Sequence, residues 1–156
     1  MKTNNKYNPD MMLSDDYRLG EFCESETARL LGIDNRPSAT AVAHLRQLCC
    51  EVVQPLRDHY GLPIAVRSGY RSEALNEALH GVGASLHLIG CAADLEVPDI
   101  DTARRWYLWV VNHLDFDQLF LEHDADGHCW LHVSHCPDFK QNRHQCWFYH
   151  PAPPRP

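Results

Sequence analysis

The sequence lacks the features that define several large protein classes. It has no basic cluster, and its formal net charge is −7 at pH 7. Nucleic-acid binders depend on a basic surface, so we expect no nucleic-acid partner. The longest strongly apolar run, residues 106–111, is far shorter than the roughly 20 residues that a membrane span requires. With no internal repeat and no low-complexity tract, we expect an ordinary globular monomer without membrane insertion.

An export signal and an even cysteine count are also missing. The first 20 residues contain no apolar segment of the kind that a signal peptide carries, so we expect synthesis in the cytoplasm. The seven cysteines are an odd number, and at least one therefore cannot pair within the chain. Free thiols in a reducing compartment are the expected state, rather than a disulfide framework.

The length and the order of patterns predict a single α+β domain. A chain of 156 residues can form one domain with a substantial core and is too short for two ordinary ones. We expect a flexible N-terminal arm over residues 1–12, a domain over residues 13–150 and a proline-rich tail over residues 151–156. Helical patterns come first and short strands follow, which favours a mainly antiparallel sheet covered by helices.

Apolar spacing and capping signals place the individual elements. They predict helices over residues 25–32, 38–60, 72–80 and 101–114, with Asp101 as the cap of the last. Pro55 should kink or end the second helix. Alternating patterns predict strands over residues 64–68, 91–97, 117–122, 130–135 and 145–149. The tail is too rich in proline to join the sheet.

Three side chains near two of these strands have the chemistry of a metal site. On its predicted strand, Asp94 points away from the apolar face, and His132 does the same on the strand over residues 130–135. His87 lies in the loop just before Asp94, where Gly90 lets the backbone turn. Two imidazoles and a carboxylate with one open position suit a catalytic zinc ion. The pattern therefore predicts a metallohydrolase with one Zn²⁺ per chain.

A different zinc site stays open at this point. Histidines and cysteines also gather late in the sequence: His123, His128, Cys129, His132, His135, Cys136 and Cys146. They permit a structural Cys/His zinc protein, although their spacings match no familiar finger or ribbon.

The pattern Ser85-x-His87-x-x-Gly90-x-Ala92-x-Asp94, followed by Trp130-x-His132-x-Ser134, resembles the M15 zinc peptidases. It fits best subfamily A of these peptidases, the branch with the D-Ala-D-Ala carboxypeptidase catalytic domain. Further segments that fit this branch are Glu21-Phe22, Thr27-Ala28-Arg29, Gly32-Ile33-Asp34-Asn35-x-Pro37, Pro55-Leu56-Arg57, Ser68-Gly69-Tyr70-Arg71-Ser72, Asp117-Gln118-Leu119 with Glu122, and Asn142-Arg143.

This resemblance spans residues 13–143 and implies a fold and an activity. The fold would be like that of the DD-peptidases and of Hedgehog signalling domains. Zinc would be held by His87, Asp94 and His132. The activity would be hydrolysis of peptidoglycan stem peptides, of the carboxypeptidase or endopeptidase type, in cell wall degradation.

The resemblance also assigns roles around the metal. Arg71 would act in catalysis and bind a substrate carboxylate or carbonyl oxygen, which suits a planar, permanently charged fork. Ser85 would support the ligand loop next to the substrate. His80 is a departure, because relatives often have a small residue at that loop position.

The general base is where the chain departs most from the family. Relatives of the dipeptidase type place an acid three residues before the last ligand, and this chain has Cys129 there. Strand parity brings Glu122 to the face of the site, and we take it as the base. Asp126 and His128, in the loop that follows, are alternatives.

Two further hypotheses follow from these departures. Without the acid at position 129, a non-catalytic Hedgehog-like zinc-binding module stays open. The presumed substrate lies outside the inner membrane, and we expect no signal peptide, so we expect action on the cell wall after a phage-type release.

Overall fold

A mixed five-stranded sheet organises the part of the chain that the computed structural model describes, residues 7–137 and 141–151. Its strands are β1 (Val66–Ser68), β2 (Ala92–Glu96), β3 (Gln118–His123), β4 (Cys129–Ser134) and β5 (Gln145–Pro151), in the order β1-β2-β4-β3-β5. The expected α+β class is confirmed. The sheet is mixed rather than uniformly antiparallel, because β5 runs parallel to β3 while β1–β2, β2–β4 and β3–β4 are antiparallel.

Most helices begin where the sequence predicted. The helices are α1 (Leu19–Cys23), α2 (Glu26–Leu31), α3 (Ala39–Leu48), α4 (Gln54–Tyr60), α5 (Glu73–Ala78) and α6 (Ile100–His113). Hydroxyls of Ser25, Ser38 and Ser72 cap α2, α3 and α5 by accepting a backbone N–H bond. The predicted cap of α6 was wrong. Asp99, not Asp101, accepts the bond from the Thr102 N–H, at 2.7 Å.

The long helix predicted over residues 38–60 changes its winding instead of ending. A π-helical segment, η1 (Cys49–Val53), joins α3 to α4. Pro55, the second residue of α4, has no N–H to give to the helical ladder, which accounts for the change of winding just before it. Gly61, with φ of 63°, then ends α4 in the left-handed conformation.

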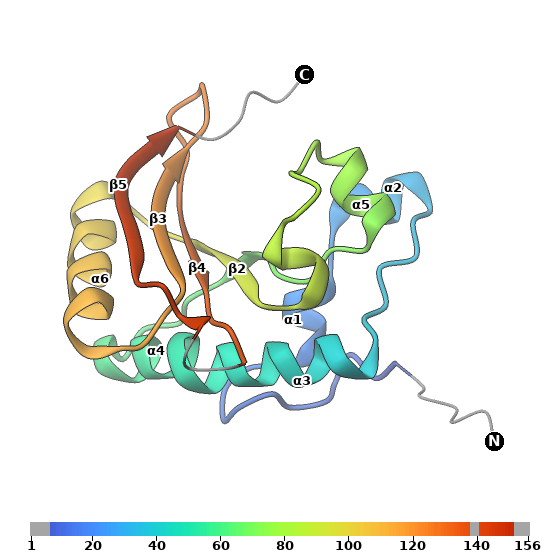
Figure 1. The fold of residues 1–156 in the computed structure, drawn as a ribbon, viewed down its shortest axis with the longest axis horizontal. Coiled ribbons are helices and arrows are strands. Elements are labelled where there is room, and N and C mark those ends of the chain that lie inside the picture. The colour runs from blue at the N-terminus through green and yellow to red at the C-terminus, as the bar shows by residue number, and fades with distance from the viewer. Residues whose placement is uncertain (1–6, 138–140, 152–156) are drawn as a thin grey trace.

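The apolar face of the sheet carries the core. Figure 1 shows α6 packed beside the sheet and the α3–η1–α4 rod along its base. The buried strand residues in this core are Ala93, Leu95, Leu119, Leu121, Leu131 and Val133. Because strand side chains alternate, Asp94, Phe120 and His132 must point to the opposite face.

The two predicted ends fall partly outside the described residues, which exclude 1–6 and 152–156. Residues 8–11 of the predicted arm lie against α1, where the Leu19 and Gly20 N–H groups donate to Met11 O and Pro9 O. Pro151 is the last residue of β5, so the first residue of the predicted tail does join the sheet. An edge strand tolerates proline because no further strand needs its N–H.

Two further expectations concern the cysteines and the possibility of a membrane span. The seven cysteines all lie in the described residues, and no disulfide joins any two of them. Within the described residues, no helix has the length and apolar character needed to cross a membrane.

A buried ion pair anchors the segment that leads into β5. The Asp117 carboxylate, only 1% exposed, accepts hydrogen bonds from Arg143 Nε and Nη2, both at 2.8 Å. Burial alone would raise the pKa of Asp117, but the bonds and charge of Arg143 hold that pKa below its usual value. A lowered folded-state pKa means that the stabilisation is present above the unfolded pKa, about 3.9, and is lost as the pH falls through the folded pKa.

Asp117→Asn is therefore expected to lower the free energy of unfolding by about 2 kcal/mol at neutral pH, since a neutral amide cannot accept the same set of charged donors. The gap between variant and wild type should narrow as the pH falls below about 4. Urea unfolding at a series of pH values measures both effects. Equal unfolding free energies at neutral pH would contradict this role.

Candidate metal centre

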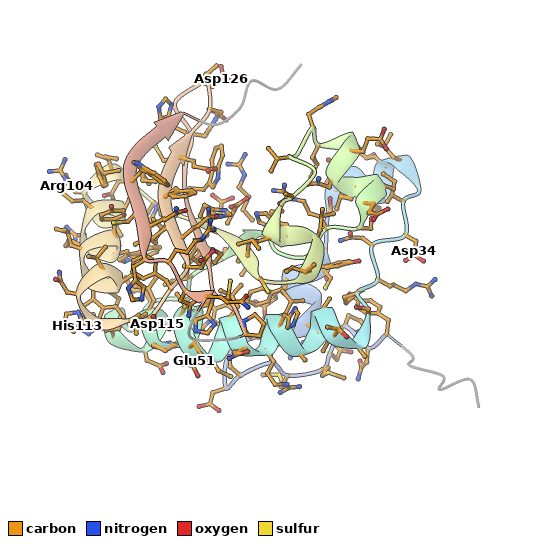
Figure 2. The ribbon with its side chains drawn as sticks, in the orientation of Figure 1. Asp34, Glu51, Arg104, His113, Asp115 and Asp126 are labelled. Atoms are coloured by element: carbon orange, nitrogen blue, oxygen red, sulfur yellow. The ribbon has the colours of Figure 1, made fainter. Side chains whose placement is uncertain are left out.

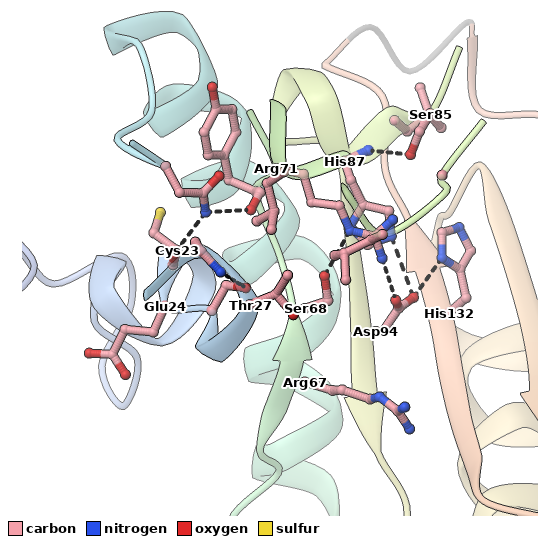
Figure 3. A pocket seen from close by; sticks show the side chains of 18 of the residues that line it. Cys23, Glu24, Thr27, Arg67, Ser68, Arg71, Ser85, His87, Asp94 and His132 are labelled. Carbon is pink, nitrogen blue, oxygen red and sulfur yellow. Dashed lines mark hydrogen bonds and ion pairs between the residues drawn. The ribbon is translucent and has the colours of Figure 1, made fainter. Parts of the chain in front are cut away.

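The register of two strands brings the three predicted ligands together. Asp94 on β2 is paired directly with His132 on β4. The Asp94 Oδ1 atom lies 2.8 Å from His132 Nδ1 and 3.5 Å from His87 Nε2. One ligand atom from each residue lies within 4.8 Å of the other two, and the side chains are at most 12% exposed. Figure 3 shows the two imidazoles facing the carboxylate.

His87 is oriented by the loop that precedes β2. It lies in the 3₁₀ turn η2 (Leu86–Ile89), which Ser85 caps by accepting from the His87 N–H at 3.3 Å. His87 Nδ1 lies 2.6 Å from the carbonyl oxygen of Gly69. Because a carbonyl only accepts, Nδ1 must carry the proton, which leaves the Nε2 lone pair directed towards Asp94. A neutral imidazole fixed in this way is ready to bind a cation.

Gly69 makes this arrangement possible by a close approach of two backbones. A Cβ atom at position 69 would lie 2.3 Å from the carbonyl oxygen of Phe22. That oxygen accepts from the Tyr70 N–H at 2.7 Å, so α1 fixes the loop that carries the carbonyl partner of His87. Only glycine fits there, which explains the glycine of the Ser-Gly-Tyr-Arg sequence.

Arg71 holds the second oxygen of the ligand carboxylate. Its Nη2 donates to Asp94 Oδ2 at 3.2 Å, and its Nε donates to Ser68 Oγ at 3.0 Å. Asp94 thus presents one oxygen to the imidazoles and the other to the guanidinium. The sequence predicted a substrate contact for Arg71, and the structure places it against a predicted metal ligand.

The electrostatics of the group suit a bound cation. Burial lowers the pKa of His87 and favours its neutral form. Burial alone would raise the pKa of Asp94, but the two imidazoles hold that pKa well below its usual value, so the carboxylate is ionised. Burial opposes a charged His132, yet its bond to Asp94 raises its pKa. A buried anion flanked by two imidazoles is a donor set that fits Zn²⁺.

The three residues open onto a cavity of about 1200 Å³, large enough for a peptide. Ser85, Arg71, Glu122 and His80 all line it. The alternative bases do not. Figure 2 shows Asp126 at the tip of the β3–β4 turn, and His128 in the same turn has a 72% exposed side chain.

Two aromatic residues of the site had no predicted role. The Trp130 indole N–H donates to Glu122 Oε2 at 2.8 Å, across the β3–β4 pair. The Phe120 ring stacks on His132, with centroids 5.5 Å apart and planes 14° apart. Strand parity already placed both residues on this face. Strand parity could not predict the hydrogen bond of Trp130 to Glu122 or the stacking of Phe120 on His132.

The Cys/His alternative is not assembled. In the described residues, two groups of three have metal-ligand spacing: the ligand group above and the exposed set Asp124, Asp126 and His128. Neither contains a cysteine.

A buried His–Asp–His group that lines a cavity defines a candidate metallohydrolase centre. The family model described as Peptidase M15 matches residues 16–130, most of the chain, and the protein belongs to this family. The match includes His87 and Asp94 and ends two residues before His132. No curated protein shows significant similarity to the chain. M15 peptidases depend on zinc, and membership implies a peptide substrate.

The purified protein is expected to contain about one zinc ion per chain, and His87→Ala and His132→Ala should each lose it, because two remaining ligands hold zinc poorly. His128→Ala is the matched control, since it removes an imidazole from the other group. Elemental analysis after dialysis gives the stoichiometry. Zinc retained in both ligand variants, or lost in the control, would show that the ion binds elsewhere.

Proposed function

We propose that the protein is a zinc-dependent peptidase that hydrolyses peptide bonds of peptidoglycan stem peptides. The observation that carries this proposal is the direct cross-strand pairing of Asp94 with His132, with His87 closing the group at a peptide-sized cavity. Family membership supports the reaction class. Degradation of the cell wall, reached by a phage-type release, is the corresponding biological role.

The residues around the cavity divide the work of amide hydrolysis. Zinc held by His87, Asp94 and His132 would supply Lewis acidity, which lowers the pKa of water and polarises a carbonyl. Glu122 takes a proton from the attacking water while the water oxygen forms a bond to the substrate carbonyl carbon. The same carboxyl group then returns that proton to the amine as the C–N bond breaks.

Trp130 positions Glu122 for this role. Its indole N–H holds one oxygen of the carboxylate at 2.8 Å. Glu122 pairs with Trp130, and Trp130 is two residues from His132 on the same face of β4. The separation along the strand is then about 7 Å, within reach of a water between the carboxylate and the metal group.

Each of the two non-catalytic alternatives makes one structural demand that differs from those of a peptidase. A Hedgehog-like zinc module needs no acid in the cavity, whereas Glu122 lines it. A structural zinc protein needs the ion to fold, whereas the core cluster here forms on the opposite face of the sheet.

Glu122→Gln should keep its zinc and lose at least about 100-fold in kcat, since a carboxamide cannot accept the proton. Asp126→Asn is the matched control and should keep wild-type activity. Hydrolysis of defined muropeptides, followed by mass spectrometry, measures both. Full activity in the Glu122 variant would exclude it as the base.

Removal of zinc with a chelator should abolish hydrolysis while the far-ultraviolet circular dichroism stays unchanged, because the core does not include the metal ligands. Zinc added back should restore activity. Unfolding on chelation would instead support the structural-zinc alternative.

A further inference from the structure

One arginine of the cavity has no carboxylate within ion-pair distance among the residues that the structure describes. Five arginines line it, and four of them are ion-paired: Arg29 with Glu26, Arg36 with Asp34, Arg71 with Asp94 and Arg143 with Asp117. The fifth, Arg67, has no carboxylate partner in residues 7–137 and 141–151. A half-buried cation without an internal counter-ion suits an anionic ligand.

Among the described residues, the side chain of Arg67 packs on an aromatic ring and donates no hydrogen bond. Arg67 lies on β1, where the register with β2 shifts between Val66 and Ser68. Its side chain reaches across β2, so that the guanidinium carbon lies 4.3 Å from the centre of the Trp130 ring on β4. Figure 3 shows it extending below Asp94. A guanidinium over an indole uses its flat face and keeps its N–H groups for a ligand.

Arg71, in contrast to Arg67, uses its N–H groups for hydrogen bonds within the protein. Its Nη2 and Nε already donate to Asp94 and Ser68. Binding a substrate carboxylate through these groups would release the ligand carboxylate that they hold. Arg67 is therefore better suited to the anchoring role that the sequence gave to Arg71.

The position of Arg67 fixes how far such an anchor lies from the reaction. Trp130, beneath Arg67, is two residues from His132 along β4, a separation of about 7 Å. An extended substrate residue spans about 3.5 Å. A carboxylate on Arg67 would therefore be one or two residues from a carbonyl at the metal group.

We propose that Arg67 binds a substrate carboxylate one or two residues from the scissile bond, and so sets the specificity of the cleft. This inference rests on the proposed peptidase function. In a stem peptide such a carboxylate comes from the chain terminus, as in a carboxypeptidase substrate, or from an acidic residue within the peptide.

Three matched stem pentapeptides separate these sources: one with all carboxylates free, one amidated at the C-terminus and one amidated at the internal D-glutamate. For wild-type protein, one amidation should lower kcat/KM by roughly ten- to 100-fold, as expected for loss of a bond to a charged group. Arg67→Gln should lower kcat/KM for the free peptide to that of the sensitive amide and leave the amide unaffected. The sensitive peptide identifies the source.

Arg36→Gln is the matched control, because it removes a cavity arginine that Asp34 already neutralises. It should discriminate between the peptides as wild type does. Arg67→Lys keeps the cation over Trp130 but not the fork, and should keep part of the discrimination. It also serves as the test if Arg67→Gln does not fold.

Calorimetry with the same peptides and zinc-free protein measures binding without hydrolysis. It therefore separates the proposal for Arg67 from the proposed peptidase function. If binding depends on Arg67 and the carboxylate while wild type hydrolyses nothing, the anchor stands and the peptidase proposal fails. If the Arg67 variants discriminate as wild type does in both binding and hydrolysis, the anchor is overturned.

Discussion

The site depends on one cross-strand pair, Asp94 opposite His132. In an antiparallel pair, directly opposed side chains lie on the same face and close together. The alternation that buries Leu95 and Leu131 in the core therefore also forces this carboxylate and imidazole together on the other face. A slip of one residue would bury the ligands and expose the core, so the hydrophobic free energy of the core protects the geometry of the site.

Around that pair, each ligand is fixed by a neighbour that binds no metal itself. Gly69 supplies the carbonyl for His87, Arg71 holds the outer oxygen of Asp94, and Phe120 stacks on His132. Such partners set tautomer and orientation before a cation arrives. This preorganisation requires two backbone segments to approach closely at Gly69, which leaves no room for a side chain there.

Periodicity and capping predicted the five strands, most of the helices and the convergence of the ligands, because alternation and capping are local rules, but they missed the short helix α1. They placed α2 between Ser25 and Gly32 and put Asp94 and His132 on one face. The parallel pairing of β5 could not be predicted, since the contacts that accompany it, such as the buried Asp117–Arg143 pair, join residues that are distant in the sequence. For the same reason, the sequence could not show that Arg71 is ion-paired while Arg67 packs on an aromatic ring. The contacts of each arginine are made with residues on other strands.

X-ray absorption at the zinc edge tests the central claim most directly, because it reports the donor atoms around the ion. The pairing of Asp94 with His132 beside His87 predicts a first shell of nitrogen and oxygen only, at about 2.0–2.1 Å, with the scattering pattern of two imidazoles. A sulfur shell near 2.3 Å would contradict the account, because it would place the ion on cysteines and away from this pair.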